Sequence, residues 1–360
     1  MKNIMITGGA GFIGSNFIRY IFEKTGFKGA VINYDKLTYA ANLNNLIDIH
    51  RKFWGKRYFF VKGDICDYKT FLATMKKYDI DVVVNFAAES HVDRSIFGPK
   101  DFIDTNINGT FISLEACRKY WRDRKDVRFH HISTDEVYGS LGPEGYFYET
   151  TPYSPRSPYS ASKASADHIV MAYFHTYGMP VTISNCSNNY GPYQFPEKLI
   201  PLIITNAFEG KDLPVYGDGK NIRDWIYVED HCRAIWLILK KGKVGESYNV
   251  GGECEKENIE VVKNICLKLE KIYPSSNNPK LKGKKYIDLI KFVKDRPGHD
   301  RRYAINCDKI KNELGFKCYY DFDSAIDSTI KWYISNYKWV KEVKSGEYQK
   351  WISKNYKNRR

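Results

Sequence analysis

The sequence predicts an α/β fold with a doubly wound parallel sheet and a smaller, mixed α/β C-terminal part. Through the first half of the chain, short β-rich runs alternate with longer amphipathic runs, as expected of parallel strands joined by crossover helices. The first run leads into a glycine-rich turn and a helix-like segment. From about Asn189 the alternation gives way to turn-forming residues, which indicates a second, less regular part.

The individual elements follow from these runs. Strands are expected at residues 3–7, 30–34, 58–62, 82–86, 128–133 and 181–185, and helices at 12–24, 69–78, 102–120 and 158–177. Further along, residues 225–240 have the pattern of a strand–helix return, 257–272 that of a lysine-rich helix, and 273–285 that of an exposed loop.

The composition argues against several classes of protein. With 360 residues, 43% of them hydrophobic and 27% charged, the chain is long enough for two domains and has the make-up of a globular protein. No apolar run approaches the roughly 18 residues that span a bilayer. The N-terminus lacks the features of a signal peptide, and the eight Cys form no C-x-x-C pair. We therefore expect a cytoplasmic protein without a metal site.

The net charge of +14 raises nucleic acid as a partner. Much of the excess lies in residues 331–360, however, which carry nine Lys or Arg against two Glu. A solvated basic surface, or attraction for a phosphorylated small substrate, explains the same charge. No nucleic-acid partner is expected.

The turn ITGGAGFIG places Gly8, Gly11 and Gly14 three residues apart, between a strand and a helix. Glycines there allow a tight turn, close approach of the backbone to a pyrophosphate and close helix–strand packing. Asp35 ends the second strand 21 residues after Gly14, where an acid accepts hydrogen bonds from an adenosine ribose. The acid repels a ribose 2′-phosphate and so favours NAD over NADP, a preference that the neighbouring Lys36 weakens. The unit predicts a Rossmann-type dinucleotide site; a purely structural turn is the alternative.

Two other positions have competing interpretations. Asp64, after the third strand, is expected either at the adenine edge or as a helix cap. His130 and His131 are neighbours on a strand and face opposite ways, so they are interpreted as packed histidines rather than a metal pair.

SPYSASKASADH contains Tyr159 and Lys163, which at i, i+4 project from one helix face. The usual tyrosine pKa of about 10 makes a poor base at neutral pH, but a nearby ammonium stabilises the phenolate. Removing a hydride from an alcohol also requires removal of its proton, which suits this pair. Thr134, 25 residues before Tyr159, ends a β-rich run. A chance surface pair is the alternative.

Together, TGGAGFIG, Y-x-x-x-K and the hydroxyl-bearing strand end resemble the extended short-chain dehydrogenase/reductase superfamily. Within it, STDEVYG, AAESHVDRS, SPYSASKASADH, NCSNNYGP, FPEKLIP, IRDWIYVEDH and DRPGHDRRYAI resemble the blocks of the dTDP-glucose 4,6-dehydratase family of nucleotide-sugar 4,6-dehydratases. These blocks cover nearly the whole chain. A relative acting on UDP-glucose would share most of them.

The resemblance implies a lyase of deoxysugar biosynthesis with tightly bound NAD. Its reaction oxidises carbon 4 of the glucose, eliminates water across carbons 5 and 6, and returns the hydride to carbon 6. It implies Tyr159, with Lys163, as base at the 4-hydroxyl, Thr134 at the 4-oxygen, Glu136 as base at carbon 5 and Asp135 as acid for the 6-hydroxyl. Asp135 then needs a raised pKa, and a turn must begin after Thr134 for the three side chains to converge. Alternatively, the acids only favour a helix N-terminus.

The expected binding residues surround these positions. For the cofactor they are Gly8, Gly11, Phe12, Ile13, Gly14, Asp35, Lys36, Thr38, Asp64, Ile65, Ala87, Ala88, Thr105, Tyr159, Lys163 and Asn189. For the substrate they are Ser90, Thr134, Asn188, Glu197, Lys198, Leu199, Pro214, Tyr216, Arg223, Asn258, Arg296 and His299. The two arginines are expected at the diphosphate, because a guanidinium fork suits phosphate oxygens.

The expected organisation is an NAD-binding domain at residues 1–188 with a return segment at 225–250, a nucleotide-sugar-binding domain at 189–224 and 251–345, and a basic tail at 346–360. The helices at 102–120 and 158–177 are those through which the family forms homodimers. The expected partners are a small-molecule nucleotide sugar and a second copy of the chain, with no membrane.

Two other functions share part of these sequence features. A nucleotide-sugar 4-epimerase typically has small or hydroxyl residues where this chain has Asp135 and Glu136. A non-enzymatic NAD-binding sensor would need neither these acids nor Tyr159 and Lys163.

Overall fold

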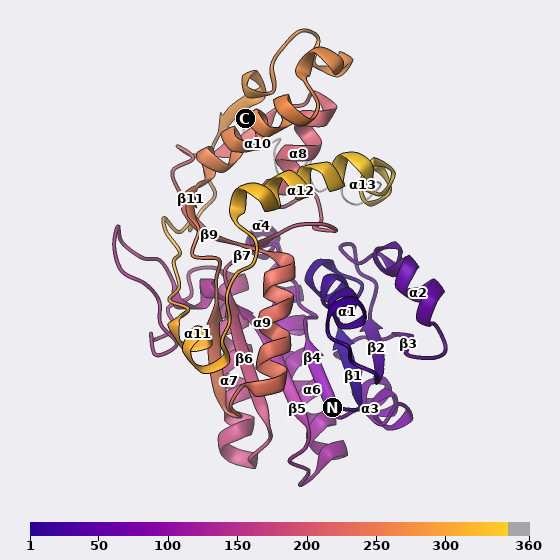
Figure 1. Cartoon of the computed structure of the whole chain (residues 1–360). Coiled ribbons are helices and arrows are strands. Elements are labelled where there is room, and N and C mark those ends of the chain that lie inside the picture. Colours follow the sequence, from indigo (N-terminus) through magenta and orange to yellow (C-terminus); the bar gives the residue numbers. More distant parts are fainter. Residues whose placement is uncertain (345–360) are drawn as a thin grey trace.

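A seven-stranded parallel sheet forms the larger lobe of the molecule (Figure 1). In this computed structural model, which describes residues 1–344, the strands are β1 (Asn3–Thr7), β2 (Ala30–Asp35), β3 (Tyr58–Lys62), β4 (Val82–Asn85), β5 (Arg128–Thr134), β6 (Val181–Cys186) and β10 (Glu246–Val250). Their order is β3-β2-β1-β4-β5-β6-β10. The chain therefore reverses direction across the sheet between β1 and β4, the position at which open α/β sheets bind ligands. The predicted fold class is confirmed.

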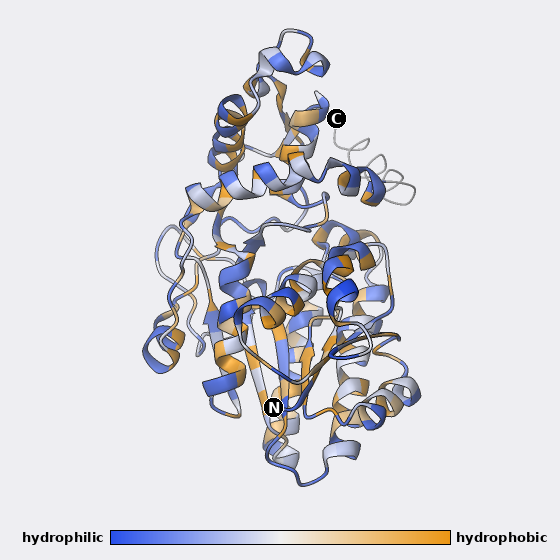
Figure 2. Ribbon diagram, turned by 45° about the vertical axis from the view of Figure 1, so that its right-hand side comes forward, coloured by the Kyte–Doolittle hydropathy of each residue, from blue (hydrophilic) through white to orange (hydrophobic). Residues whose placement is uncertain are grey.

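Helices cover both faces of this sheet. On one face, α1 (Phe12–Lys24) and α9 (Val228–Lys241) share an apolar cluster with β1, β2 and β4. On the other, α3 (Tyr68–Lys77), α6 (Thr110–Trp121) and α7 (Pro158–Tyr177) do the same. Figure 2 shows apolar residues concentrated in the central strands and polar residues on the outer helical surfaces. Both faces of the sheet are buried, as parallel sheets require.

The helix expected at 102–120 is interrupted. It consists of α5 (Lys100–Phe102), a π-helical stretch (Ile103–Gly109) and α6. Within the wide turn, the buried Asn106 side chain bonds both backbone groups of Glu89, at 2.9 and 3.0 Å, and donates to Ser162 Oγ at 2.8 Å. Such stretches often occur at functional sites. Here the widened turn ties this helix to the loop after β4.

The expected return segment is divided between two sheets. α9 and β10 return to the large sheet, where β10 lies parallel to β6. β9 (Ile222–Tyr227) instead pairs with β7 (Asn188–Tyr190) and β11 (Glu255–Glu257) in a three-stranded sheet. The strand at the start of the return therefore belongs to the connection between the lobes.

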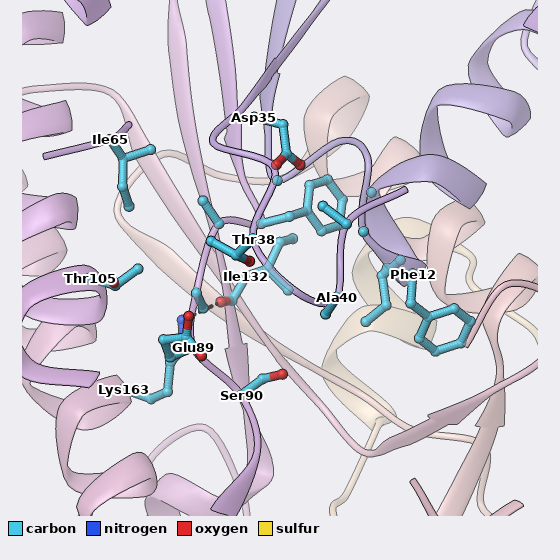
Figure 3. Close-up of a pocket in the computed structure, with 18 of the residues that line it drawn as sticks. Phe12, Asp35, Thr38, Ala40, Ile65, Glu89, Ser90, Thr105, Ile132 and Lys163 are labelled. Carbon is cyan, nitrogen blue, oxygen red and sulfur yellow. Dashed lines mark hydrogen bonds between the residues drawn. The ribbon is translucent and has the colours of Figure 1, made fainter. Parts of the chain in front are cut away.

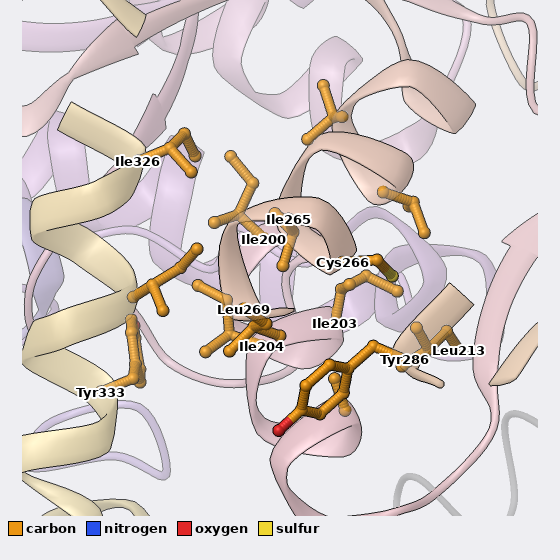
Figure 4. Packing of buried hydrophobic residues seen from close by; sticks show 14 of the residues in the cluster. Ile200, Ile203, Ile204, Leu213, Ile265, Cys266, Leu269, Tyr286, Ile326 and Tyr333 are labelled. Carbon is orange, nitrogen blue, oxygen red and sulfur yellow. The ribbon is translucent and has the colours of Figure 1, made fainter. Parts of the chain in front are cut away.

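The smaller lobe is built around α8 (Leu199–Glu209), α10 (Asn258–Ile272) and α12 (Phe322–Ser335). Their apolar side chains, among them Ile203, Ile265 and Ile326, interlock in one core (Figure 4). The remaining elements of residues 1–344 as a whole are a two-stranded sheet and four helices. The sheet consists of β8 (Leu213–Tyr216) and β12 (Ile290–Val293), and the helices are α2 (Ile47–Phe53), α4 (Val92–Phe97), α11 (Asp308–Leu314) and α13 (Tyr337–Val343). The loop expected at 273–285 carries two short 3-10 turns. The basic tail expected at 346–360 lies outside the described residues.

Of the helices in residues 1–344, none combines the length and apolar character needed to cross a membrane.

A buried carboxylate ties the two lobes together. Asp230, in the first turn of α9, accepts hydrogen bonds from Arg233 at 2.9 Å and from the backbone amides of Tyr319 and Tyr320 at 2.9 to 3.1 Å. We predict that Asp230→Asn lowers the free energy of unfolding by about 3 kcal/mol, because these donors lose a buried charge.

The matched control is Asp218→Asn. Asp218 also meets an arginine at 2.9 Å, but both side chains are 54% exposed, so this change should cost less than about 1 kcal/mol. Urea unfolding followed by tryptophan fluorescence measures both variants. Equal losses would contradict the role given to Asp230.

Candidate active site

A cavity of about 890 Å³ lies along the edge of the sheet where β1 to β6 end. It is lined by residues that follow each of these strands, and by α7 and the π-helical stretch. In Figure 3, Asp35 lies at one end of the cavity and Ser90 and Lys163 at the other. All sixteen residues expected to bind the cofactor line it.

The glycine turn is shaped by close backbone packing. Gly8 has a φ of +66°, and a Cβ there would lie 2.8 Å from the Ala87 nitrogen; a Cβ on Gly14 would lie 2.4 Å from the Gly8 oxygen. Gly11 is the N-cap of α1 and supplies no side-chain cap, while Phe12, Ile13 and Gly14 line the cavity. The amides of this first turn are therefore available to an anion. The turn fits a dinucleotide pyrophosphate.

Asp35 connects the end of β2 to that turn. Its carboxylate accepts hydrogen bonds from the Ala10 amide at 2.9 Å and the Leu37 amide at 2.7 Å. Burial raises its pKa, against the effect of these two bonds. Asp35 thus lines the cavity beside the glycine turn.

Asp64 lines the same end of the cavity and does not cap a helix. Its carboxylate accepts from the Cys66 amide at 2.9 Å and pairs with Lys36 Nζ at 2.6 Å. The N-cap of α3 is Asp67, so the helix-cap interpretation of Asp64 is wrong. The pairing also neutralises the cation that weakened the preference for NAD.

The turn required after Thr134 is present. β5 ends at Thr134, and a 3-10 turn follows at Asp135–Tyr138. The Thr134 hydroxyl caps this turn by accepting from the Glu136 amide at 3.3 Å, so neither acid serves as the cap. Thr134 and Glu136 line the cavity, whereas Asp135 lies behind its wall with only 2% of its surface exposed.

Burial controls the charge of both acids. It raises the pKa of Asp135 well above its usual range, with further contributions from Glu136 and Asp224. One oxygen of Asp135 accepts from Thr134 at 3.3 Å, and the other has no hydrogen-bond partner within residues 1–344, which favours the neutral acid. Burial also raises the pKa of Glu136, opposed by Arg296 and other cations. The two carboxyls are thus in different environments, as an acid and a base require.

Tyr159 and Lys163 both line the cavity. The expected effect of the Lys163 ammonium on the pKa of Tyr159 is not seen, however. Lys163 Nζ donates to the Ile132 carbonyl at 2.7 Å and lies 3.1 Å from His131 Nε2. Burial lowers its pKa to about 8. Burial and the Glu136 charge raise the pKa of Tyr159 well above its usual value, opposed by a hydrogen bond with Thr134. Burial has the largest effect on the pKa of Tyr159, and the Lys163 ammonium is not among the main influences on it. The expected stabilisation of the phenolate by Lys163 is therefore not found.

The residues expected at the substrate fall into two groups. Ser90, Thr134, Asn188, Glu197 and Lys198 line the cavity; Leu199, Pro214, Tyr216, Arg223, Asn258, Arg296 and His299 do not. Leu199 packs against the core of the smaller lobe.

Two arginines of the second group, the buried Arg223 and the partly buried Arg296, nevertheless act on the acids. Arg223 lies over the Tyr303 ring, 4.3 Å from its centre, and donates to the Asp300 carbonyl at 2.9 Å. Arg296 lies 3.7 Å from Asp93. Both are among the charges that lower the pKa of Glu136, so they lie near the part of the cavity that Glu136 lines.

Several cavity residues were not anticipated from the sequence. They are mostly polar or aromatic: Glu89, Asp101, Asp104, Asn108, Gln194 and Phe195. Glu89 directly precedes Ser90 after β4, so the strand-end rule would have found it. Asp104 and Asn108 reach the cavity through the π-helical stretch, for which the sequence gives no signal.

Comparison with known proteins agrees with this geometry. The family model described as GDP-mannose 4,6 dehydratase matches residues 5–329. The dTDP-glucose 4,6-dehydratase 1 of Escherichia coli (strain K12) is 54% identical over 370 aligned positions, 99% of each chain. The crystal structure of dTDP-glucose 4,6-dehydratase from Bacillus anthracis in complex with NAD aligns with a TM-score of 0.84 at 48% identity, over 95% of this chain and 100% of that one.

An epimerase is more distant. UDP-glucose 4-epimerase from Thermotoga maritima aligns with a TM-score of 0.79 but at 26% identity, over 93% of this chain and 99% of that one. Sequence blocks, cavity and relatives lead to the same assignment. This chain belongs to the dTDP-glucose 4,6-dehydratase family.

Proposed function

We propose that this protein is an NAD-dependent lyase that converts dTDP-glucose to dTDP-4-keto-6-deoxyglucose. The observation that carries the proposal is the turn after β5, which places Glu136 in the cavity and next to it the buried Asp135, whose pKa burial raises. Identity of 54% to the Escherichia coli relative over 99% of both chains supports dTDP-glucose as the substrate. UDP-glucose is the alternative, because the acids and the cofactor site do not distinguish the two bases.

The glycine turn, Asp35 and the small residues after β4 would hold NAD, with its pyrophosphate at the N-terminus of α1. Bound NAD supplies reversible hydride transfer, which makes the overall reaction redox-neutral. Ala87 and Ala88 line the cavity between the glycine turn and Ser90. Their small side chains leave room for the cofactor to approach the sugar.

Tyr159 takes the proton of the 4-hydroxyl while Thr134 holds the 4-oxygen. This step needs the Tyr159 phenolate, which burial disfavours; the positive charge that bound NAD would bring favours it. The 4-ketone makes the hydrogen on carbon 5 acidic, and Glu136 removes it as a proton. Asp135 gives its proton to the 6-hydroxyl, which leaves as water. Because Asp135 lies behind the cavity wall, we infer that its carboxyl turns towards the sugar when substrate binds. The Arg223 and Arg296 cations favour the charged form of Glu136.

We further propose the expected two-domain division and a cytoplasmic homodimer that associates through α6 and α7. Large apolar side chains are exposed on these helices and the stretch before them: Ile103 is 49% exposed, Phe111 46% and Tyr177 51%. Exposed apolar and aromatic side chains of this kind are common at subunit interfaces.

The dimer is tested by Phe111→Glu. A charge at the centre of an apolar interface should convert the protein to monomers in light scattering. Leu267→Glu is the matched control, since Leu267 is 63% exposed on α10, away from α6 and α7. A monomeric wild-type protein, or equal effects of both variants, would contradict the proposal.

The activity is tested by incubating the protein with dTDP-glucose and UDP-glucose separately and measuring the 4-keto product by its absorbance in alkali. We expect product from dTDP-glucose and at least about tenfold less from UDP-glucose, equivalent to about 1.4 kcal/mol of discrimination. Absence of product from both would refute the dehydratase assignment.

The acids are tested by Glu136→Gln and Asp135→Asn. Each should slow dehydration by about 100-fold or more, the usual contribution of general acid–base groups, while the NAD content of the purified protein stays near that of wild type. Glu144→Gln, in the exposed part of the 140–153 loop, is the control and should change neither quantity. Parallel loss of NAD and activity would assign the acids a structural role instead.

A further inference from the structure

The catalytic face of α7 continues one turn beyond Lys163. Tyr159, Lys163 and Asp167 follow each other at intervals of four residues, so they lie on one side of the helix. Lys163 is 3% exposed and Asp167 1%. A buried carboxylate just over two turns from the catalytic tyrosine has no part in the reaction described above.

His131 lies between Lys163 and Asp167. Its Nε2 atom is 3.1 Å from Lys163 Nζ and 3.5 Å from Asp167 Oδ1. On the other side of the ring, Nδ1 lies 3.1 Å from Asn85 Nδ2, and the Asn85 oxygen accepts from the Thr7 hydroxyl at 2.6 Å. Asn85 of β4 thus holds the ring, and Thr7 of β1 holds Asn85 in turn.

The two oxygens of Asp167 are used differently. Oδ2 accepts hydrogen bonds from Ser133 at 2.6 Å, Tyr153 at 3.0 Å and Asn185 at 3.4 Å. Oδ1 has no hydrogen-bond partner within residues 1–344 and faces His131. Three donors therefore fix the carboxylate so that its second oxygen points towards the imidazole and the lysine.

Few charged groups surround Lys163 and Asp167. Lys163 is influenced by Asp167 of its own helix and by Cys186 of β6, and of these Asp167 has the larger effect. Asp167 meets Lys163, His131 of β5, and the hydroxyl of Tyr153 in the 140–153 loop, while Tyr138 of the 3-10 turn also senses its charge. Burial and Lys163 lower the pKa of His131 well below its usual value, so the imidazole is neutral. Burial raises the pKa of Asp167 to about 6.

We propose that Asp167 is a positioning residue for the reaction, which keeps Lys163 protonated and, with His131 as the spacer, holds its ammonium at the Ile132 carbonyl. This role rests on the proposed function of Tyr159 and Lys163. Burial without Asp167 would leave Lys163 neutral over much of the neutral range, because desolvation disfavours the cation. The alternative is that Asp167 only ties α7 to β5, β6 and the 140–153 loop.

The test follows Lys163 directly, in NAD-loaded protein carrying ¹³C-labelled lysine. Its side-chain signal is identified by its loss in Lys163→Met and followed by NMR as the pH is raised. In wild type the midpoint should lie near pH 8. Asp167→Asn should lower it by about one pH unit or more, the effect of removing an opposite charge at short range.

Tyr153→Phe is the matched control. It removes one hydrogen bond from Asp167 but keeps the charge, so its midpoint should stay close to that of wild type. Asp167→Glu should restore the wild-type midpoint. A shift in Asp167→Asn no larger than that in Tyr153→Phe would overturn the proposal in favour of the structural role.

Wild-type protein provides a second measurement, which stands even if Asp167→Asn does not fold. The Lys163 signal should show a smaller inflection near pH 6, where Asp167 titrates; its absence would also overturn the proposal. These results do not depend on product formation. If the proposed activity fails, the midpoints still decide the relation between Asp167 and Lys163. If it holds, the alkaline limb of kcat should move to lower pH in Asp167→Asn.

Discussion

The active site depends on the common direction of the strands. All strands of the large sheet are parallel, so β1 to β6 end at one edge, and the reversal between β1 and β4 opens this edge to a ligand. The glycine turn after β1, Asp35 of β2, Ser90 after β4 and Thr134 of β5 therefore meet in one cavity. The parallel arrangement alone therefore brings together residues that are more than 100 positions apart in the chain.

Burial also has a large effect on the protonation of the side chains in this cavity. The same desolvation that raises the pKa of Asp135 lowers that of Lys163. It therefore favours the neutral form of both side chains. Nearby charges decide how far each effect goes: Glu136 adds to the first, and Asp167 opposes the second. Acid, base and ammonium can therefore coexist in one pocket at neutral pH, although none of them titrates as it would in water.

Regular features could be predicted from the sequence, and irregular ones could not. α1 and α7 begin and end where expected, because Ser157 and Pro158 mark the start of α7 and Gly178 its end, each a strong local signal. The residues expected at the cofactor came partly from strand ends and glycines and partly from the family resemblance, and all of them line the cavity. The π-helical stretch, the pairing of β9 and the direction of the Asp135 side chain depend on contacts between distant segments, such as that of Asn106 with Glu89, which no local pattern encodes. The pKa of Tyr159 was mispredicted because burial was unknown.

One isotope experiment tests the central claim, that hydride transfer and loss of water occur in this single site. The protein is incubated with dTDP-glucose carrying deuterium at carbon 4, and the product is examined by NMR and mass spectrometry. We expect a 4-keto product with the deuterium at carbon 6 and a solvent-derived hydrogen at carbon 5. Deuterium retained at carbon 4 of a hexose product would indicate epimerisation, and deuterium lost to water would mean that no hydride is returned. Either result would rule out a redox-neutral dehydration in this site.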